Sequence, residues 1–209
     1  IGLNGFSLGI LLMDDSAKAH KTRISASLYM VLMSATAMVL GMTPDALAAC
    51  VNTLGSNYSC GGTINTTQNI GTADAAIVTD ETLFLNSGAG NGLNITGGGY
   101  STFYLAEGAV IQTDPSWRGL NYYAGSIGES QLDATINGTI SGGSAGISAN
   151  HYGTGAININ NYGTISGVNS GIDISTDANV YGVSVILDAA SVVQGTNGDG
   201  IRVNHGGTG

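Results

Sequence analysis

The chain has 209 residues, of which 43% are hydrophobic and only 9% are charged, and its formal net charge is −9. Such an acidic chain repels phosphate backbones, so we expect no nucleic-acid partner, and its apolar fraction is too high for a disordered segment. Its 34 glycines and its many short apolar runs separated by Gly, Asn and Asp predict an all-β fold with frequent turns.

The first predicted element is an export signal, which we assign to residues 1–48. The basic segment 18–23 precedes the uncharged run 24–42, which is the order of a secretory signal peptide. Small residues end this region, and we expect cleavage between Ala48 and Ala49. The signal implies transfer by the Sec export machinery and a location at the cell surface or outside the cell.

Two alternatives remain for this region. Asp14 and Asp15 oppose a positive start, so the signal is either an extended one or begins at Met13. The apolar run also approaches the roughly 20 residues of a transmembrane helix. Pro44 and the small residues at the cleavage position favour the cleaved signal over the membrane span.

Two cysteines, Cys50 and Cys60, follow the cleavage position. Residues 47–50, L-A-A-C, also fit a lipobox, in which Cys50 would be lipidated and would anchor the chain to a membrane. That would leave Cys60 as an odd thiol in an oxidising compartment, so we favour a disulfide between the two cysteines. We place the pair in an N-terminal cap, residues 49–75.

Internal repeats occupy residues 76–209, and we expect the repeat region to be truncated at its C-terminal end. Two segments, 137–142 and 161–167, share the pattern G-T-I-S-G. Aligning on their Ile residues extends the match to five repeats, spaced by 26, 29, 25 and 28 residues. The anchor positions of the five repeats are Leu85, Ile111, Ile140, Ile165 and Val193.

Apolar residues at a period of two flank each anchor, which is typical of a strand with one buried face. Each repeat therefore predicts a strand, a bend, a strand, a Gly-rich turn and a third strand. After the anchors, the aliphatic positions are Leu93, Leu120, Ile147, Ile172 and Ile201. Eight and six residues before the anchors, the aligned positions are Ile77, Phe103, Leu132, Ile157 and Val185, then Thr79, Leu105, Ala134, Ile159 and Leu187.

Three short strands per repeat predict a right-handed parallel β-helix, a β-solenoid of about five coils. Each coil stacks on the previous one and buries one side of every strand. A β-sandwich and a β-propeller are the alternatives, since both use short Gly-rich strands. A repeat of about 27 residues holds too few strands for a propeller blade, and a sandwich would not keep its core columns in register over five repeats.

The chain resembles the passenger regions of bacterial autotransporters, the type V secretion proteins, and related surface adhesins. The features behind this resemblance are the long signal ending in A-L-A, the cysteine pair, and the two copies of G-T-I-S-G followed by G-I. The resemblance implies display or release through a C-terminal outer-membrane β-barrel, which we expect outside these residues. It indicates an architecture more than an activity.

Two sequence patterns could indicate chemistry, and we assign neither of them a function. Residues 142–146, G-G-S-A-G, match the G-x-S-x-G pattern of serine hydrolases, but they form a turn of the repeat, and Asn169 replaces Ser144 in the next repeat. Residues 195–200 resemble a calcium-binding repeat, yet the Gly and Asp offsets do not match.

The remaining candidates are histidines and acidic residues. His151 and His205 lie in predicted turns without ligands near them in sequence, so we expect solvated histidines and no metal or cofactor site. Glu81 and Glu107 occupy equivalent positions of successive coils, which supports the alternative of a polysaccharide lyase or glycosidase. Because no basic residue lies near them, we favour solvated bends, with no catalytic residues.

The function we favour is a non-catalytic surface module for adhesion, aggregation or host contact. Its repeated positions are aliphatic or Gly, and its exposed positions are mainly Asn, Ser and Thr. Such a surface suits glycans, a host surface or another copy of the chain as partners. The identity of the ligand does not follow from the sequence.

Overall fold

The computed structural model describes residues 49–125, 128–177 and 180–206. All regular structure in these residues is β-strand, which confirms the all-β prediction. The predicted signal peptide and Ala48 lie outside the described residues. Among the residues that are described, no helix is long and apolar enough to cross a membrane.

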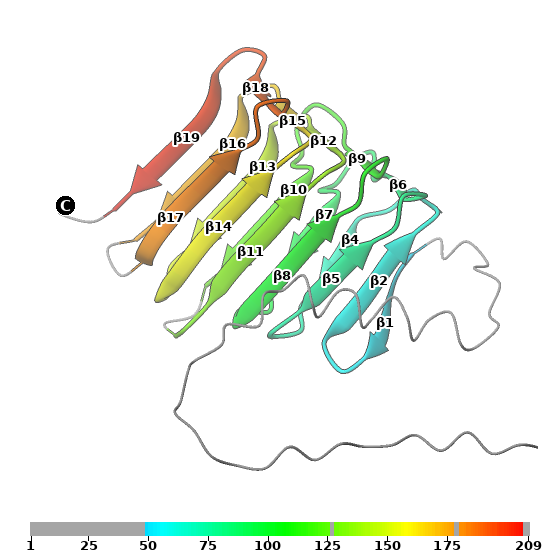
Figure 1. Cartoon of the computed structure of the whole chain (residues 1–209), viewed down its shortest axis with the longest axis horizontal. Helices are drawn as coiled ribbons and strands as arrows, with labels where there is room; N and C mark the ends of the chain where they lie inside the picture. The colour runs from blue at the N-terminus through cyan, green and yellow to red at the C-terminus, as the bar shows by residue number, and fades with distance from the viewer. Residues whose placement is uncertain (1–48, 126–127, 178–179, 207–209) are drawn as a thin grey trace, which may run out of the picture. The chain divides into compact units, whose positions relative to one another are not determined.

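The strands form three sheets, which we name A, B and C (Figure 1). Sheet A consists of β1 (Ala49–Leu54), β2 (Asn57–Gly61), β5 (Ala76–Thr79), β8 (Tyr100–Leu105), β11 (Gln131–Ile136), β14 (Gly155–Asn161) and β17 (Val180–Leu187). Sheet B consists of β3 (Thr63–Ile64), β6 (Phe84–Asn86), β9 (Val110–Gln112), β12 (Thr139–Gly142), β15 (Thr164–Gly167) and β18 (Val192–Gly195). Sheet C consists of β4 (Gln68–Ile70), β7 (Leu93–Ile95), β10 (Leu120–Ala124), β13 (Ala145–His151), β16 (Ser170–Thr176) and β19 (Asp199–His205).

The chain passes through sheets A, B and C in turn and then begins the next coil, and every strand pair except β1 with β2 is parallel. This arrangement is a parallel β-solenoid and confirms the predicted fold. Each of the five sequence repeats supplies one strand to each sheet. β2, β3 and β4 pair in parallel with β5, β6 and β7, so the solenoid begins at Asn57, before the first repeat.

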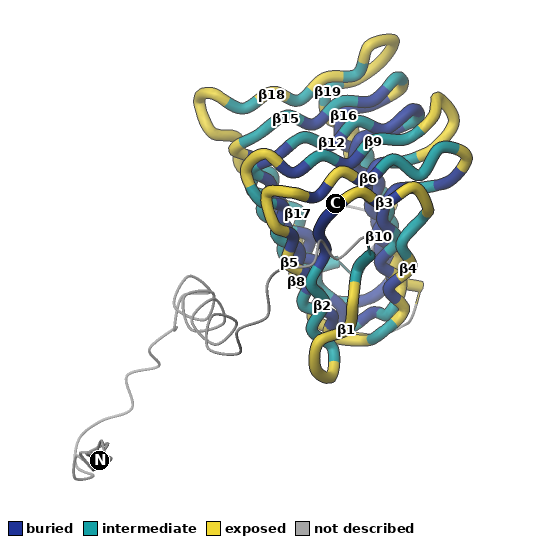
Figure 2. The backbone as a smooth tube through the Cα atoms, turned by 90° about the vertical axis from the view of Figure 1, so that its right-hand side faces the viewer, coloured by how far each residue is buried: buried dark blue, intermediate teal, exposed yellow. Residues whose placement is uncertain are grey.

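The interior is a set of apolar columns, each with one residue per coil. Along β11 the side chains alternate between half-buried and buried, as the period of two predicts. Figure 2 shows the buried residues along the strands of the stacked coils. Two predicted columns are confirmed by the strand register: Ile140 with Ile165 and Val193, and Ile147 with Ile172 and Ile201.

The predicted alignment in sheet A is wrong by two residues in the middle coils. Phe103 pairs with Ala134 rather than with Leu132. Ile157 pairs with Val183 rather than with Val185. The bend from sheet A to sheet B has four residues after β5, β8 and β17 but two after β11 and β14. A shift by two leaves the same side chains facing inward, so the apolar pattern could not reveal it.

In these bends, side-chain oxygens accept hydrogen bonds from backbone N–H groups and fix the path of the chain. In the longer bends, Asp80 Oδ1 accepts from the backbone nitrogen of Thr82 at 2.8 Å, and Asp188 accepts in the same way. In a shorter bend, Asn161 Oδ1 accepts from the nitrogen of Gly163 at 3.2 Å. A Cβ at Gly163 would lie 2.1 Å from a backbone oxygen of the preceding bend, so the shorter bend requires glycine there.

The first strand closes one end of the solenoid. β1 runs antiparallel to β2 and places Cys50 opposite Cys60, and the two cysteines form the predicted disulfide. The backbone nitrogen of Cys50 donates to Gln68 Oε1 at 3.1 Å, which ties β1 to sheet C as well. A structural disulfide of this kind indicates a non-reducing environment.

Candidate functional site

The outward face of sheet B is uncharged along all of its described strands. One outward column has an amide or a hydroxyl side chain in each of the five repeats, and the strand register stacks these groups at about 4.8 Å along the solenoid axis. The residues of this column are Asn86, Gln112, Ser141, Ser166 and Gln194. The column can exchange hydrogen bonds with a neutral polar partner.

A ladder of amides runs along the outward face of sheet C. Asn94 Nδ2 donates to Asn69 Oδ1 at 2.7 Å, and Asn121 Nδ2 donates to Asn94 Oδ1 at 3.1 Å. Asn91 donates to the same oxygen at 2.8 Å. Because these amides satisfy one another across coils, the ladder orders the surface as well as presenting polar groups to solvent.

The same column ends in an ion pair on the last coils. Arg202 Nε donates to Asp173 Oδ1 at 3.0 Å and Nη2 donates to Oδ2 at 2.9 Å, a bidentate arrangement. The hydrogen bond to Asp173 raises the pKa of Arg202. The pair could have been found in the sequence, since the two residues occupy one position of adjacent repeats.

The described outward face of sheet A has no buried cluster of carboxylates. Its Asp133 is half-buried and accepts hydrogen bonds from two amide side chains. Its Oδ1 accepts from Asn158 Nδ2 at 2.6 Å and its Oδ2 accepts from Gln131 Nε2 at 2.8 Å. Both partners are neutral amides that donate to the carboxylate. We regard this group as part of the polar ladder system rather than as an acid–base site.

The prediction that His151 is a solvated turn residue is wrong. His151 is the last residue of β13 and is fully buried, because the period of two that places Ile147 and Ala149 inward continues to it. Its Nε2 lies 2.7 Å from the carbonyl oxygen of Ser130 and 2.8 Å from the Ser130 hydroxyl. A carbonyl can only accept, so Nε2 carries the proton and donates.

A buried tyrosine stacks beside this histidine. The rings of Tyr122 and His151 are 6.3 Å apart and nearly parallel, at 13°. Burial raises the pKa of Tyr122 to about 12, and the neighbouring Ser130 opposes this shift only in part. Among the described residues, neither the Tyr122 hydroxyl nor His151 Nδ1 has a hydrogen-bond partner. Since Ser130 is also buried, this Ser–His pair cannot meet a substrate from solvent and is structural.

The second predicted turn histidine, His205, is the last residue of β19. It is exposed, and its Nδ1 lies 2.8 Å from Thr176 Oγ1. The described residues contain no group of three or more His, Cys, Asp or Glu side chains that could hold a metal ion. Asp199, from the segment that resembles a calcium-binding repeat, is the first residue of β19 and is exposed.

Ser144 lies in the two-residue turn between β12 and β13, with a strand rather than a helix after it. Its hydroxyl accepts from Asn169 Nδ2 at 3.5 Å, the equivalent turn of the next coil. Packing explains the flanking glycines: a Cβ at Gly142 or Gly143 would lie within 2 Å of a backbone oxygen. The match to the hydrolase pattern therefore reflects tight turns, and the context that the pattern requires is not met.

Glu81 and Glu107 lie in the bends after β5 and β8, and both are exposed. They are equivalent, because the strands that follow them pair Phe84 with Val110 and Leu85 with Ile111. The next two bends have no carboxylate, so the structure does not extend this pair into an acidic groove.

A cavity of about 330 Å³ lies between the last strands of sheets A and C. Its lining includes Val183 and Val203, which belong to inward-facing columns, together with Tyr181 and His205. The cavity is thus the opening of the apolar interior at the last coil. The described residues of its lining include no Asp, Glu, Lys or Arg.

The chain matches no protein-family profile, no curated protein and no solved structure. Its interpretation therefore depends on the geometry above. That geometry presents ordered rows of neutral hydrogen-bonding groups on sheets B and C, and it separates the candidate acids, histidines and serine from one another. Such rows suit binding to an extended polar partner.

Proposed function

We propose that this chain is an exported, non-catalytic binding module of a bacterial surface protein that contributes to adhesion, aggregation or host contact. The observation behind this proposal is the neutral polar column on sheet B together with the neutral amide ladder of the first coils of sheet C, both of which continue over several coils. A repeated, uncharged row of donors and acceptors fits a long partner better than a small substrate, whose binding uses a concave pocket.

Export is supported by two independent features. The segment before Ala49 has the order of a signal peptide, and the disulfide indicates a non-reducing environment. We further propose that the solenoid is the passenger region of an autotransporter, because the fold suits such a passenger and the sequence resembles one. Its outer-membrane β-barrel would then be encoded outside this sequence.

The export proposal can be tested on protein recovered from the cell exterior. Intact mass before and after reduction should give a chain that begins at Ala49 and gains two hydrogens on reduction, as one disulfide requires. A lipid-sized mass increment on Cys50, with a free thiol at Cys60, would contradict it in favour of the lipobox.

The adhesion proposal can be tested with beads coated with the full chain. We expect coated beads to clump or to bind host cells or glycan surfaces, and we expect no turnover of polysaccharides or esters. Beads coated with the Ile165→Asp variant, whose core is disrupted, are the control. Turnover that is lost in Glu81→Gln or Ser144→Ala would overturn the proposal, as would the absence of any binding or clumping.

A further inference from the structure

A row of exposed tyrosines follows one corner of the solenoid, which we name the C–A corner. It comprises only described residues: those of the connections from sheet C to sheet A after β7, β10, β13 and β16, which are 96–99, 125, 128–130, 152–154 and 177, with the adjacent strand ends. The described residues include five exposed tyrosines, and four of them lie at this corner, one for each of four successive connections. The four are Tyr100, Tyr123, Tyr152 and Tyr181, with exposed fractions of 56%, 46%, 42% and 79%.

Different local features hold these tyrosines at the surface. The rings of Tyr123 and Tyr152, from successive coils, meet edge to face at 5.9 Å and 62°. The backbone nitrogen of Tyr100 donates to Asp74 Oδ1 at 2.7 Å, which positions the start of β8. Tyr181 is the extra residue of a β-bulge in β17, a feature that redirects a side chain.

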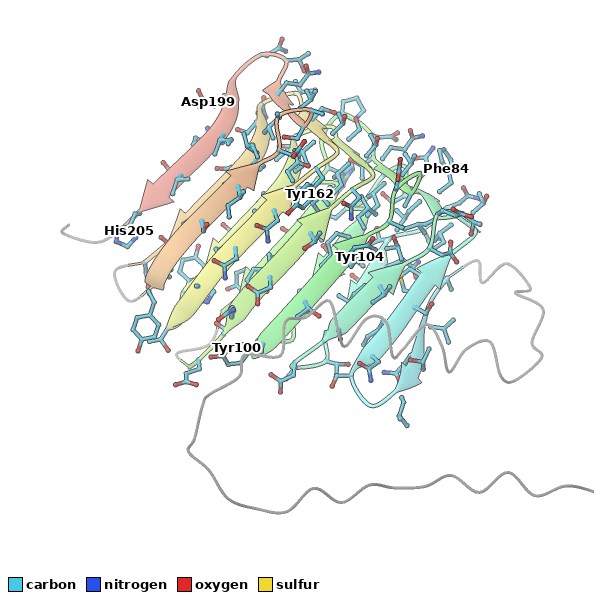
Figure 3. The ribbon with its side chains drawn as sticks, in the orientation of Figure 1. Phe84, Tyr100, Tyr104, Tyr162, Asp199 and His205 are labelled. Carbon is cyan, nitrogen blue, oxygen red and sulfur yellow. A yellow bond between two sulfur atoms is a disulfide. The ribbon has the colours of Figure 1, made fainter. Side chains whose placement is uncertain are left out.

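Figure 3 shows Tyr100 at the edge where the strands of sheet A begin, and His205 at the end of β19 on the same edge. A glycine supports one of the rings: a Cβ at Gly125 would lie 2.5 Å from the Tyr123 ring. The backbone therefore passes close to this ring without covering it, since Tyr123 remains exposed.

Neutral hydrogen-bonding groups lie beside the rings. Tyr123 belongs to an outward column of sheet C whose later members are Asn150, Ser175 and Asn204. Aromatic faces next to amides and hydroxyls are the groups that bind a sugar ring, which has apolar faces and a hydroxylated rim. The coil spacing of about 4.8 Å is close to the length of one sugar residue, so successive coils can meet successive sugars.

The charges near the corner select against an anionic ligand. Glu129 is an exposed carboxylate in the connection after β10. Asp74 is an exposed carboxylate of the preceding connection, after β4, and it accepts from the backbone nitrogen of Tyr100 at the corner. The described residues include two arginines and no lysine: Arg202 is paired with Asp173 on sheet C, and Arg118 lies before β10, at the opposite end of that strand from Tyr123. The electrostatics thus favour a neutral ligand.

We propose that the C–A corner binds a neutral, linear oligosaccharide that runs along the solenoid axis. The tyrosines stack on the sugar faces, and the flanking amides and hydroxyls bond to the sugar hydroxyls. This inference rests on the proposed binding function and assigns it a ligand class and a surface. The C–A corner differs from the polar columns on sheets B and C as a binding surface, because its contact with the ligand depends on aromatic rings.

The test measures binding of the full chain to neutral hexasaccharides of glucose and of N-acetylglucosamine by calorimetry, with a hexamer of galacturonic acid as the anionic probe. In Tyr123→Ala/Tyr152→Ala we expect affinity to fall about tenfold, which corresponds to about 1.4 kcal/mol. Tyr123→Phe/Tyr152→Phe should stay within about threefold of the parent, because it keeps the stacking faces.

Tyr162→Ala is the matched control, since Tyr162 is equally exposed but lies in the bend from sheet A to sheet B. It should bind like the parent, and each variant should keep the parent's unfolding midpoint. No binding of any neutral hexasaccharide, preferred binding of the anionic one, or equal loss in Tyr162→Ala would overturn the inference. Beads that still clump or bind cells after such a result would leave the adhesion proposal standing, so the two can fail separately.

Discussion

The two ends of the described solenoid differ in how far their inward-facing residues are buried. On the first coil, Cys60, Ile64 and Ile70 are at most 2% exposed. On the last coil, the inward-facing residues Ile201 and Val203 are 39% and 47% exposed, and Figure 2 shows this coil largely in the intermediate and exposed colours. Their partners one coil earlier are fully buried.

This difference shows that burial in a solenoid belongs to the interface between coils rather than to the residue. Ile172 and Ile201 are the same amino acid at the same repeat position, and only the first has a described coil on both sides. Stability is then approximately a sum of contributions from the coils and from the interfaces between neighbouring coils. The comparison predicts that equivalent substitutions have unequal effects along the axis.

The largest expected effect comes from a charge in the middle of the core. Ile165→Asp should lower the free energy of unfolding by about 4 kcal/mol or more, because Ile165 is fully buried and an aspartate there has no partner. Val193→Asp, at the same position of the last coil, should cost about half as much or less, since Val193 is only partly buried. Urea unfolding monitored by circular dichroism measures both, and equal losses would contradict the nearest-neighbour account.

The closed end can be weakened by removing its covalent link. Cys50→Ser/Cys60→Ser should lower the free energy of unfolding by about 2 to 3 kcal/mol, because the disulfide spans a sequence separation of 10 residues and limits the unfolded chain. Hydrogen exchange should quicken first in β1 and β2, with β14 as the internal control. Uniformly faster exchange in every strand would show that the first coil does not behave as a separate cap.

The buried tyrosine provides a pH-dependent test of the middle coils. Folding raises the Tyr122 pKa to about 12, above the ordinary value near 10, so its neutral form is favoured in the folded chain. The full free energy of unfolding is therefore present below about pH 10. As the pH rises from about 10 toward 12, the unfolded chain loses the tyrosine proton more readily than the folded chain, and the free energy of unfolding falls by about 2 kcal/mol. Tyr122→Phe should therefore lose less stability than the parent between pH 9 and about pH 11.5.

The control for this titration is Tyr162→Phe, which removes an exposed hydroxyl. Thermal unfolding of both variants and the parent over this alkaline range gives the comparison. If the stability of Tyr122→Phe and of Tyr162→Phe fell with pH in the same way, the burial of Tyr122 would not explain why the parent loses stability at alkaline pH.

The smallest expected effect is at the ion pair between the last two coils. Asp173→Asn should lower the free energy of unfolding by less than about 1 kcal/mol, because both side chains are partly exposed and water screens their attraction. The difference from the parent should shrink as salt rises from about 0.05 M to 1 M. Asn204→Ser, on the same strand as Arg202, is the control, and a loss that does not change with salt would argue against an electrostatic origin.

Much of the fold could be predicted because the repeat aligns chemically similar residues. The columns through Ile140 and through Ile147 were predictable, since G-T-I-S-G before the turn and G-I after it recur in two successive repeats. The sheet A register was not, because Phe103 is followed by a four-residue bend and Ala134 by a two-residue one. Only the pairing of strands reveals which bend is shorter.

The candidate surfaces were less predictable than the core. The amide ladder from Asn69 to Asn121 occupies one repeat column and could have been inferred, whereas the tyrosines of the C–A corner occupy different positions within their repeats. Their proximity depends on the connections, whose lengths vary. His151 was misjudged for a related reason: the sequence does not show how far β13 extends beyond Ile147 before the chain turns.

The sequence by itself determined the all-β class, the repeat, the apolar columns beside the anchors and the cysteine pair, because each depends on residue type at a local spacing. The tertiary structure decided the register of sheet A and the burial of His151 and Tyr122. These depend on which coil lies above and below each residue, and a side chain's access to water is a property of those neighbours rather than of its own place in the chain.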